Sequence, residues 1–377
     1  MRGAAPGDEV EVTLTRVRPR SLHGFVHRRL TDGPHRVPAF CPQVERCGGC
    51  PWQGIEPTTQ RAALGRHVSH LLTRAVGHPV EVVAEAVQPT VAWRTTTRIH
   101  WQNGNIGFHG ARSDAVVDLN DCPVLAPPLP ALLAAVRRHL GPVLTGEGSL
   151  RLTAAPRATS GTVHLEVGLP DGALQALLAD PACHGIVAGS RRLGTPVNVF
   201  SGVPHPAEAF VQAHPAGAAA LIDIALAQVL PGPVLELYAG SGAFTVPLAQ
   251  AGHAVTAVEY DGAAARSLAA LVAQRRLPVT VITGDAARLP PGTFASVLLD
   301  PPRAGAAEVC TALARRTEAR RPGPRRIVYV ACDPATLARD VGTLTRAGWR
   351  LTLARAFEMF PQTGHVETLV VLERGAA

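Results

Sequence analysis

The fold is decided by the stretch Val234-Leu-Glu-Leu-Tyr-Ala-Gly-Ser-Gly-Ala-Phe-Thr-Val-Pro-Leu-Ala249. Its apolar run ends in Ala-Gly-Ser-Gly and passes into a helix-like segment, which predicts a strand, a glycine turn and the start of a helix. Such a turn offers free backbone N–H groups to a ligand, and Gly240 and Gly242, which lack a Cβ, let the backbone come close to it. Thr245 stands where a dinucleotide fingerprint would have its third glycine. The stretch predicts a ligand site at the turn; the alternative is an ordinary turn of an α/β domain.

A carboxylate follows at the end of the next apolar run. Residues 254–258 form this run and Glu259 ends it. A carboxylate at the end of a strand, across from the glycine turn, suits the hydroxyls of a ribose. Glu259 is therefore a predicted ribose-binding residue.

The rest of the C-terminal half alternates between strand-like and helix-like segments. Predicted strands lie at residues 279–283, 294–299, 326–331, 351–357 and 368–372, and a helix lies at 262–274. This alternation predicts an α/β fold with a parallel sheet and helices on both faces. Ligands of such sheets bind beyond the carboxyl ends of the strands. Polar clusters fall at or beside those ends and predict one site there: Gly284-Asp285, Asp300-Pro-Pro-Arg303 and Cys332-Asp-Pro334.

Cys332 is a candidate nucleophile. It follows a predicted buried strand and precedes Asp333 at an N-cap position and Pro334 at the first helical position. A helix N-terminus lowers the pKa of a thiol, so we expect more of the reactive thiolate at neutral pH, although the charge of Asp333 opposes this. The alternative is a buried, inert cysteine, and the polar clusters beside it favour the nucleophile.

Three cysteines, Cys41, Cys47 and Cys50, lie within ten residues. Thiolates at this spacing can reach one iron–sulfur cluster or one zinc ion, and the spacing leaves both open. A fourth ligand is needed, and Cys122 is the best candidate because it lies outside any periodic element and precedes a proline. Two further thiols have helix-like or apolar surroundings and are predicted to be packed: Cys183 and Cys310.

The charge of the chain indicates a polyanionic partner. The net charge is +7, and all 36 basic residues are arginine. Residues 15–36 predict an edge ribbon, either an RNA-contacting β-module or a solvated basic face, whose arginines point outward: Arg16, Arg18, Arg20, Arg28 and Arg29. No apolar run approaches the ~20 residues that span a membrane, and the N-terminus has no signal-peptide pattern. We therefore expect a cytoplasmic protein without a membrane partner.

The remaining predictions concern the organisation of the chain. Helices are predicted at residues 59–76, 131–140, 172–179 and 207–230, a hairpin over 94–109, and antiparallel runs at 149–154 and 162–168. Changes of pattern divide the chain into predicted domains 1–40, 41–205 and 206–377.

Four motifs together resemble the RNA 5-methyluridine methyltransferases. They are Leu235-Glu-Leu-Tyr-Ala-Gly-Ser-Gly-Ala-Phe244, Leu298-Leu-Asp-Pro-Pro-Arg-Ala-Gly305, Tyr329-Val-Ala-Cys-Asp-Pro-Ala-Thr-Leu-Ala-Arg-Asp340 and Phe360-Pro-Gln-Thr-Gly-His-Val-Glu367. The cysteine pattern resembles the members that carry a 4Fe-4S cluster and act on 23S ribosomal RNA. The resemblance covers nearly the whole chain.

The resemblance implies a class I, Rossmann-like methyltransferase domain that uses S-adenosylmethionine, a central α+β domain with the iron–sulfur cluster, and a short N-terminal β piece like half of a TRAM module. The implied activity is methylation of carbon 5 of a uridine in RNA, most of all in 23S rRNA, with tRNA as the alternative, by a monomer. Cys332 would be the nucleophile and Glu367 the base. The resemblance and the glycine turn together assign the cofactor to Gln212, Tyr238, Gly240, Gly242, Glu259, Asp285 and Asp300, and the cluster to Cys41, Cys47, Cys50 and Cys122. Asp333 and His214 stand where the family often has Asn.

Two other functions are compatible with an α/β fold of this kind, and the residues distinguish both from the methylation of uridine. A methyltransferase for the amino group of adenine would have an aromatic residue after Asp-Pro-Pro, where Arg303 stands, and needs no cysteine at position 332. A non-catalytic RNA-binding factor of the same fold would need neither Cys332 nor Glu367. The intact pair therefore favours an enzyme.

Overall fold

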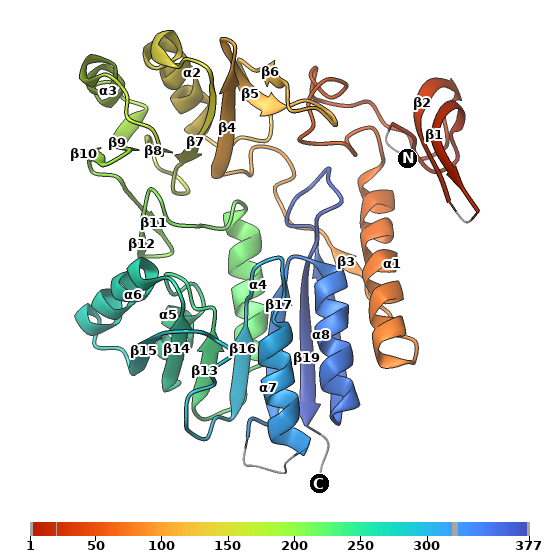
Figure 1. Cartoon of the computed structure of the whole chain (residues 1–377), viewed down its shortest axis with the longest axis vertical. Coiled ribbons are helices and arrows are strands. Elements are labelled where there is room, and N and C mark those ends of the chain that lie inside the picture. The colour runs from red at the N-terminus through yellow and green to blue at the C-terminus, as the bar shows by residue number, and fades with distance from the viewer. Residues whose placement is uncertain (1–2, 20, 319–322, 375–377) are drawn as a thin grey trace. The chain divides into compact units, whose positions relative to one another are not determined.

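The computed structural model describes residues 3–19, 21–318 and 323–374 (Figure 1). These residues form two compact units. The first contains the described residues up to Ala63, Thr90–Pro196 and Phe360–Gly364; the second contains Leu64–Pro89, Val197–Met359 and the described residues from His365 on. Helix α1 (Pro57–Val76) begins in the first unit and continues into the second. The division into three domains stays a prediction.

A mixed sheet forms the centre of the second unit, with strand order β15-β14-β13-β16-β17-β19-β18-β3. Its strands are β3 (Ala84–Glu85), β13 (Val234–Leu237), β14 (Val255–Glu259), β15 (Val279–Thr283), β16 (Ser296–Leu299), β17 (Arg326–Ala331), β18 (Trp349–Phe357) and β19 (Glu367–Arg374). Strands β13 to β17 run parallel to one another. β13 and β16 are buried along their whole length, as expected of apolar strands covered on both faces.

Four helices lie between successive strands of this sheet: α5 (Thr245–Gln250), α6 (Gly262–Gln274), α7 (Ala307–Glu318) and α8 (Pro334–Arg346). Helix α4 (Pro215–Ala227) leads into β13 and follows the ribbon of β11 (Val197–Phe200) and β12 (Val203–Pro206). Helices α5 and α6 contact β14, α8 contacts β18, and α7 packs against α8 (Figure 1). The α/β alternation predicted from the sequence is confirmed for this unit.

The last strand departs from the predicted all-parallel sheet. β19 lies between β17 and β18 and runs antiparallel to both. A short connection rather than a helix joins β18 to β19, so the chain returns in the opposite direction. The first residue of β19 consequently lies at the edge of the sheet where β16 and β17 end.

The helix predicted over residues 207–230 is wrong in its first part. Helix α4 begins only at Pro215, with His214 as its N-cap, and ends at Ala227. Proline suits the first position of a helix, where its missing N–H is not needed, but it would break a helix interior. Residues 207–214 therefore form an irregular segment that leads into α4.

The first unit is built on an antiparallel sheet with strand order β10-β9-β8-β7-β4-β5-β6, in which only the β8–β9 pair of the described strands is parallel. The strands are β4 (Thr96–Gln102), β5 (Asn105–His109), β6 (Val116–Asp118), β7 (Glu147–Thr153), β8 (Gly161–Leu165), β9 (Cys183–Ala188) and β10 (Arg191–Gly194). The predicted hairpin and antiparallel runs are confirmed.

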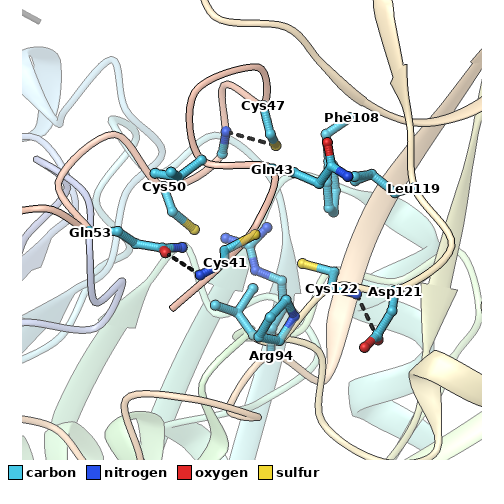
Figure 2. Close-up of a pocket in the computed structure, with 14 residues that line it drawn as sticks. Cys41, Gln43, Cys47, Cys50, Gln53, Arg94, Phe108, Leu119, Asp121 and Cys122 are labelled. Carbon is cyan, nitrogen blue, oxygen red and sulfur yellow. Dashed lines mark hydrogen bonds between the residues drawn. The ribbon is translucent and has the colours of Figure 1, made fainter. Parts of the chain in front are cut away.

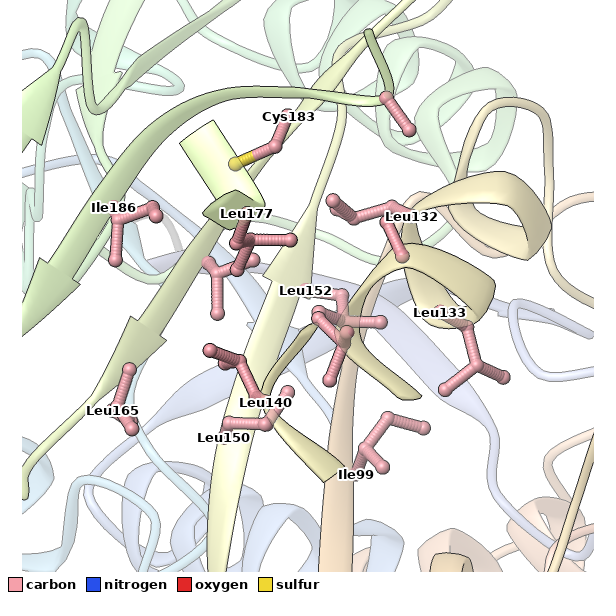
Figure 3. Packing of buried hydrophobic residues seen from close by; sticks show 14 of the residues in the cluster. Ile99, Leu132, Leu133, Leu140, Leu150, Leu152, Leu165, Leu177, Cys183 and Ile186 are labelled. Carbon is pink, nitrogen blue, oxygen red and sulfur yellow. The ribbon is translucent and has the colours of Figure 1, made fainter. Parts of the chain in front are cut away.

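Two helices, α2 (Leu129–His139) and α3 (Asp171–Leu178), cover one face of this sheet, and the turn η1 (Gly141–Val143) follows α2. The core between helices and sheet is apolar and includes Leu132, Leu152, Leu177 and Ile186 (Figure 3). The predicted helices of this region are confirmed, as is the packing of Cys183 in the core.

An antiparallel ribbon, β1 (Glu9–Arg18) and β2 (Ser21–Thr31), lies near the N-terminus. Its arginines are exposed as predicted: Arg16, Arg18, Arg28 and Arg29. Arg20 lies outside the described residues. None of the helices described in either unit combines the length and the apolar character needed to cross a membrane.

Candidate functional site

The glycine turn after β13 adopts backbone angles that favour glycine. The φ angles of Tyr238, Gly240 and Gly242 are 65°, 55° and 99°. A Cβ on Gly242 would lie 2.5 Å from Cδ1 of Leu268 in helix α6, whereas a Cβ on Gly240 would meet nothing within 4 Å. Gly242 is therefore needed for packing, and the space over Gly240 is open to a ligand.

Glu259 is fastened to this turn. Its carboxylate accepts hydrogen bonds from the backbone N–H of Gly240 (2.7 Å) and of Asp261 (2.7 Å). Since β14 pairs with β13, the end of β14 lies beside the turn. Glu259 therefore lies beside the glycine turn at the edge of the sheet where the sequence predicts a ligand site.

The other predicted cofactor residues lie around the same sheet or before it. Asp285 follows β15 and is exposed, with its carboxylate accepting from the N–H of Ala287 at 2.9 Å. Asp300 follows β16 directly and is half-buried. Gln212 lies in the segment that leads into α4. Among the described residues, no hydrogen bond joins it to the glycine turn.

Cys332 and Glu367 meet across adjacent strands. Ala331, the last residue of β17, pairs with Thr368 of β19. Cys332 follows Ala331, and Glu367 precedes Thr368, so the two side chains occupy the next register position at the edge of the sheet. The antiparallel direction of β19 thus brings together two groups that are far apart in the sequence.

Burial and neighbouring charges set the protonation of these groups. Burial, strengthened by the nearby Asp300 carboxylate, raises the pKa of Glu367 to about 8, while Arg303 opposes this shift. Burial alone raises the pKa of Asp300 to about 7. Such shifts allow a carboxyl group to exchange a proton near neutral pH.

The predicted lowering of the Cys332 pKa is wrong. Burial raises the pKa of this thiol, and the carboxylates of Glu367 and Asp300 raise it further, whereas Arg303 lowers it. A helix N-terminus follows the thiol as predicted, but burial beside two acidic groups outweighs it. The thiol is therefore mostly protonated in the free protein at neutral pH.

Helix α8 fixes the loop that carries Arg303. The buried Asp340 carboxylate accepts from the N–H of Ala306 (2.7 Å) and the hydroxyl of Tyr329 (2.8 Å). The hydroxyl of Thr336 donates to the carbonyl oxygen of Arg303 at 3.2 Å. Because α8 begins next to Cys332, the same helix positions the thiol and the loop beside it.

The two positions that differ from the family pattern both cap helices. Asp333 accepts from the N–H of Ala335 (3.0 Å) and of Thr336 (2.8 Å) at the start of α8. His214 accepts from the N–H of Gly217 at the start of α4. Asp and Asn are about equally good N-caps, so Asp333 keeps the capping function of the residue that it replaces.

The sequence interpretation missed Glu236. This residue is buried in β13, and one of its carboxylate oxygens, Oε2, lacks a hydrogen-bond partner among the described residues. Burial, with smaller contributions from Asp300 and Glu259, raises its pKa to about 8. The sequence does contain a signal for this buried carboxyl group, because Glu236 is the single charged residue of an apolar strand.

These buried carboxyl groups predict how stability depends on pH. The folded pKa values of Glu236, Asp300 and Glu367 lie well above their ordinary values, so the native state holds protons that the unfolded chain releases. For these groups the free energy of unfolding is then largest below about pH 4, where the unfolded chain is also protonated, and falls as pH rises to about 8. We expect Glu236→Gln, which cannot ionise, to flatten this decline and to melt higher than the wild type at pH 8.

Thermal unfolding of both proteins at pH 6 and pH 8 checks this. A Gln variant that melts lower than the wild type at pH 8 would show that the native state stabilises the ionised form of Glu236, contrary to the expectation.

The four cysteines predicted as ligands line one cavity of the first unit. Cys41, Cys47, Cys50 and Cys122 are half-buried and surround a cavity of about 40 Å³ (Figure 2). The loop around them is held by hydrogen bonds, including one from the N–H of Cys41 to Oε1 of Gln53 at 3.0 Å. Burial raises the pKa of Cys50, and raises that of Cys122 to about 11.

No three His, Cys, Asp or Glu side chains of the described residues are arranged to hold a single metal ion.

Comparison with known proteins agrees with this site. Residues 285–375 match the family described as tRNA (Uracil-5-)-methyltransferase, and this segment contains Asp300, Cys332 and Glu367. The chain is 32% identical to the 23S rRNA (uracil(1939)-C(5))-methyltransferase RlmD of Pseudomonas entomophila, with 99% of this chain and 88% of the relative covered. It is 31% identical to the RlmD enzyme of Klebsiella pneumoniae (strain 342), with 99% and 90% covered.

Among solved structures, the tRNA (uracil-54, C5)-methyltransferase of Pyrococcus abyssi, in complex with S-adenosyl-L-homocysteine, has the same fold. Its TM-score is 0.78 at 23% identity, with 98% of this chain and 94% of that chain covered. This likeness shows the fold, and the similarity to the bacterial enzymes over nearly the whole chain confirms the resemblance inferred from the motifs. The chain belongs to the family of S-adenosylmethionine-dependent RNA uracil-C5-methyltransferases.

Proposed function

We propose that this protein methylates carbon 5 of a uridine in 23S rRNA. The observation that carries the proposal is the meeting of Cys332 and Glu367 across β17 and β19. A thiol beside a buried carboxyl group with a pKa of about 8 provides a nucleophile and a base that can work near neutral pH. Full-length similarity to the 23S rRNA enzymes supports rRNA as the substrate.

The reaction needs a nucleophile because carbon 5 of uracil is too weak to take a methyl group unaided. The Cys332 thiol first loses its proton to solvent, and the resulting thiolate adds to carbon 6, so that the electrons of the C5–C6 double bond move onto the ring as an enolate. Carbon 5 then takes the methyl group, which S-adenosylmethionine supplies when bound. The uracil must leave its base stack to reach the thiol.

Release of the product depends on Glu367. After methylation, carbon 5 carries both the methyl group and a proton, and carbon 6 is bonded to Sγ of Cys332. Glu367 takes the proton, the double bond re-forms, and the C6–S bond breaks with the thiolate as leaving group. Arg303 lowers the pKa of both Cys332 and Glu367, so its charge favours the thiolate and the carboxylate that this sequence uses.

We propose that the cofactor occupies the glycine turn and that Glu259 accepts hydrogen bonds from its ribose hydroxyls. Gly240 leaves open space at the turn, and Glu259 is held beside it. We expect Glu259→Ala to weaken binding of S-adenosylmethionine by about 1–3 kcal/mol, the usual range for a hydrogen bond to a charged group. Calorimetry on the folded variant checks this, and unchanged affinity would contradict the assignment.

We also propose that Cys41, Cys47, Cys50 and Cys122 hold a 4Fe-4S cluster. The lining of one cavity by all four thiols supports this. A further observation is chemical: Nε of Arg94, which lines the same cavity, is buried without a hydrogen-bond partner in the described part of the chain. An anionic cluster of thiolates fits this cationic surrounding.

Exposed arginines supply the electrostatic contact with RNA. The ribbon of β1 and β2 presents Arg16, Arg18, Arg28 and Arg29 to solvent. Arginine binds phosphates through two parallel hydrogen bonds and also stacks on bases. We propose that this ribbon contacts the RNA backbone, which predicts affinity that falls with rising salt.

The substrate is tested by mapping 5-methyluridine in ribosomal and transfer RNA of cells with and without this protein. We expect one uridine of 23S rRNA to lose its methyl group, and purified protein to restore it with S-adenosylmethionine. Loss confined to tRNA would move the substrate to tRNA and keep the chemistry. No loss in either RNA, together with no methylation in vitro, would overturn the proposed function.

A further inference from the structure

We propose that Arg94 positions the iron–sulfur cluster and compensates its negative charge. Its guanidinium would donate hydrogen bonds to the sulfur ligands and would raise the reduction potential of the cluster. This inference rests on the cluster proposed above. Arg94 belongs to none of the sequence motifs, and it is neither a cysteine nor a neighbour of Cys332 and Glu367.

The backbone of Arg94 is bound to the segment that carries Cys122. The N–H of Arg94 donates to the carbonyl oxygen of Val124 (2.8 Å), and its own carbonyl accepts from the N–H of Ala126 (2.9 Å). Arg94 and Leu125 form an isolated parallel bridge. The position of the guanidinium is therefore tied to the position of one predicted cluster ligand.

The side chain of Arg94 points into the cavity among the thiols (Figure 2). Its Cζ atom lies over the ring of Trp93, 4.8 Å from the ring centroid, which holds the guanidinium in one orientation. Nε is buried and has no hydrogen-bond partner among residues 3–19, 21–318 and 323–374. A buried guanidinium donor without an acceptor is costly, and it points to an acceptor that occupies the cavity.

The cavity that the guanidinium enters is lined by Cys41, Cys47, Cys50 and Cys122. Asp121 lines it as well, and its carboxylate accepts from the N–H of Cys122 at 2.7 Å. Metal binding deprotonates cysteine, and a cluster with four thiolate ligands carries net negative charge. A bound cluster would therefore supply a counter-charge to Arg94.

A positive charge and a donor beside the cluster have a defined electronic effect. Reduction adds one negative charge to the cluster, and a nearby cation stabilises the reduced form more than the oxidised form. Hydrogen bonds to the sulfur atoms act in the same direction. Removing Arg94 should therefore shift the reduction potential to more negative values and speed the loss of the cluster.

The test uses the full-length protein purified without oxygen, with the reduction potential measured by titration with a chemical reductant and cluster loss followed by its visible absorption. Arg94→Met keeps the length of the side chain and removes its charge and donors. Arg98→Met is the matched control, because Arg98 is an exposed arginine of the same strand region that lines a different cavity. We expect a more negative potential and faster loss in Arg94→Met, and wild-type values in Arg98→Met.

Arg94→Lys keeps a positive charge and covers the case in which the Met variant takes up no cluster. We expect the Lys variant to bind the cluster with a potential between those of the wild type and the Met variant. A coloured wild type with an unchanged potential and loss rate in Arg94→Met would overturn the role of Arg94 and leave the cluster standing. A Lys variant with the same reduction potential and the same rate of cluster loss as the Met variant, or one that likewise takes up no cluster, would overturn charge compensation. A colourless wild type would overturn the cluster and this inference together, before any variant is compared.

Discussion

Glu367→Gln is expected to stop the reaction after methylation, with the methylated RNA bonded to Cys332. Gln has nearly the shape of Glu but cannot accept a proton at neutral pH. Addition of the thiolate and transfer of the methyl group stay open to this variant, but removal of the carbon-5 proton does not. Turnover should fall by about 10²–10⁴-fold, the range for loss of a general base. The measurement is a protein–RNA band that resists denaturant and appears only when S-adenosylmethionine is added.

Cys332→Ala supplies the matching control. This variant should bind RNA and cofactor but form neither adduct nor product, because it has no thiol to add to carbon 6. The band should also be absent from the double variant Cys332→Ala, Glu367→Gln. Normal turnover by the Gln variant would mean that another group is the base. An adduct that persists without Cys332 would overturn the assignment of the nucleophile.

The second large effect concerns the cysteine cavity. We expect wild-type protein purified without oxygen to be brown and Cys47→Ser to be colourless. Ligation of the metal contributes to folding, so the variant should also melt lower. Each kcal/mol corresponds to about 2–4 °C in a domain of this size, so a loss of about 3 kcal/mol would lower the melting temperature by about 6–12 °C.

Cys183→Ala is the control for this experiment. Cys183 is also a cysteine of the first unit, but it is packed in the apolar core and does not line the cavity. This variant should keep the brown colour even where its core packing is weakened. Colourless wild-type protein with one bound zinc ion would contradict the cluster.

The sequence predicted most elements because their signals are local. The apolar run before Gly240 and the alternation of residues 279–331 report which segments are strands and where each strand ends. The direction of β19 is not a local property: residues 368–372 are apolar in either orientation, and only the short connection after β18 hinted at the reversal. The predicted start of α4 is wrong because Pro215 marks the first position of the helix, whereas the apolar pattern begins several residues earlier.

The sequence did not predict the electrostatics of the candidate site. Cys332 was correctly placed before a helix, but its pKa depends on Glu367 and Asp300, which come close only in three dimensions. Arg94 was missed for the same reason, since its neighbours Cys50 and Cys122 come from distant segments. Glu236 could have been found, because a carboxylate within a buried strand is unusual on any reading.

The position of β19 has a consequence for the order in which the protein is made. β19 is the last strand that the structure describes, yet it lies inside the sheet between β17 and β18. Until β19 has emerged from the ribosome, the edge of β17 that pairs with it stays unpaired. Cys332, which follows β17, is then present without Glu367. A nascent chain therefore contains Cys332 before it contains Glu367, the residue to which we assign the release of the product.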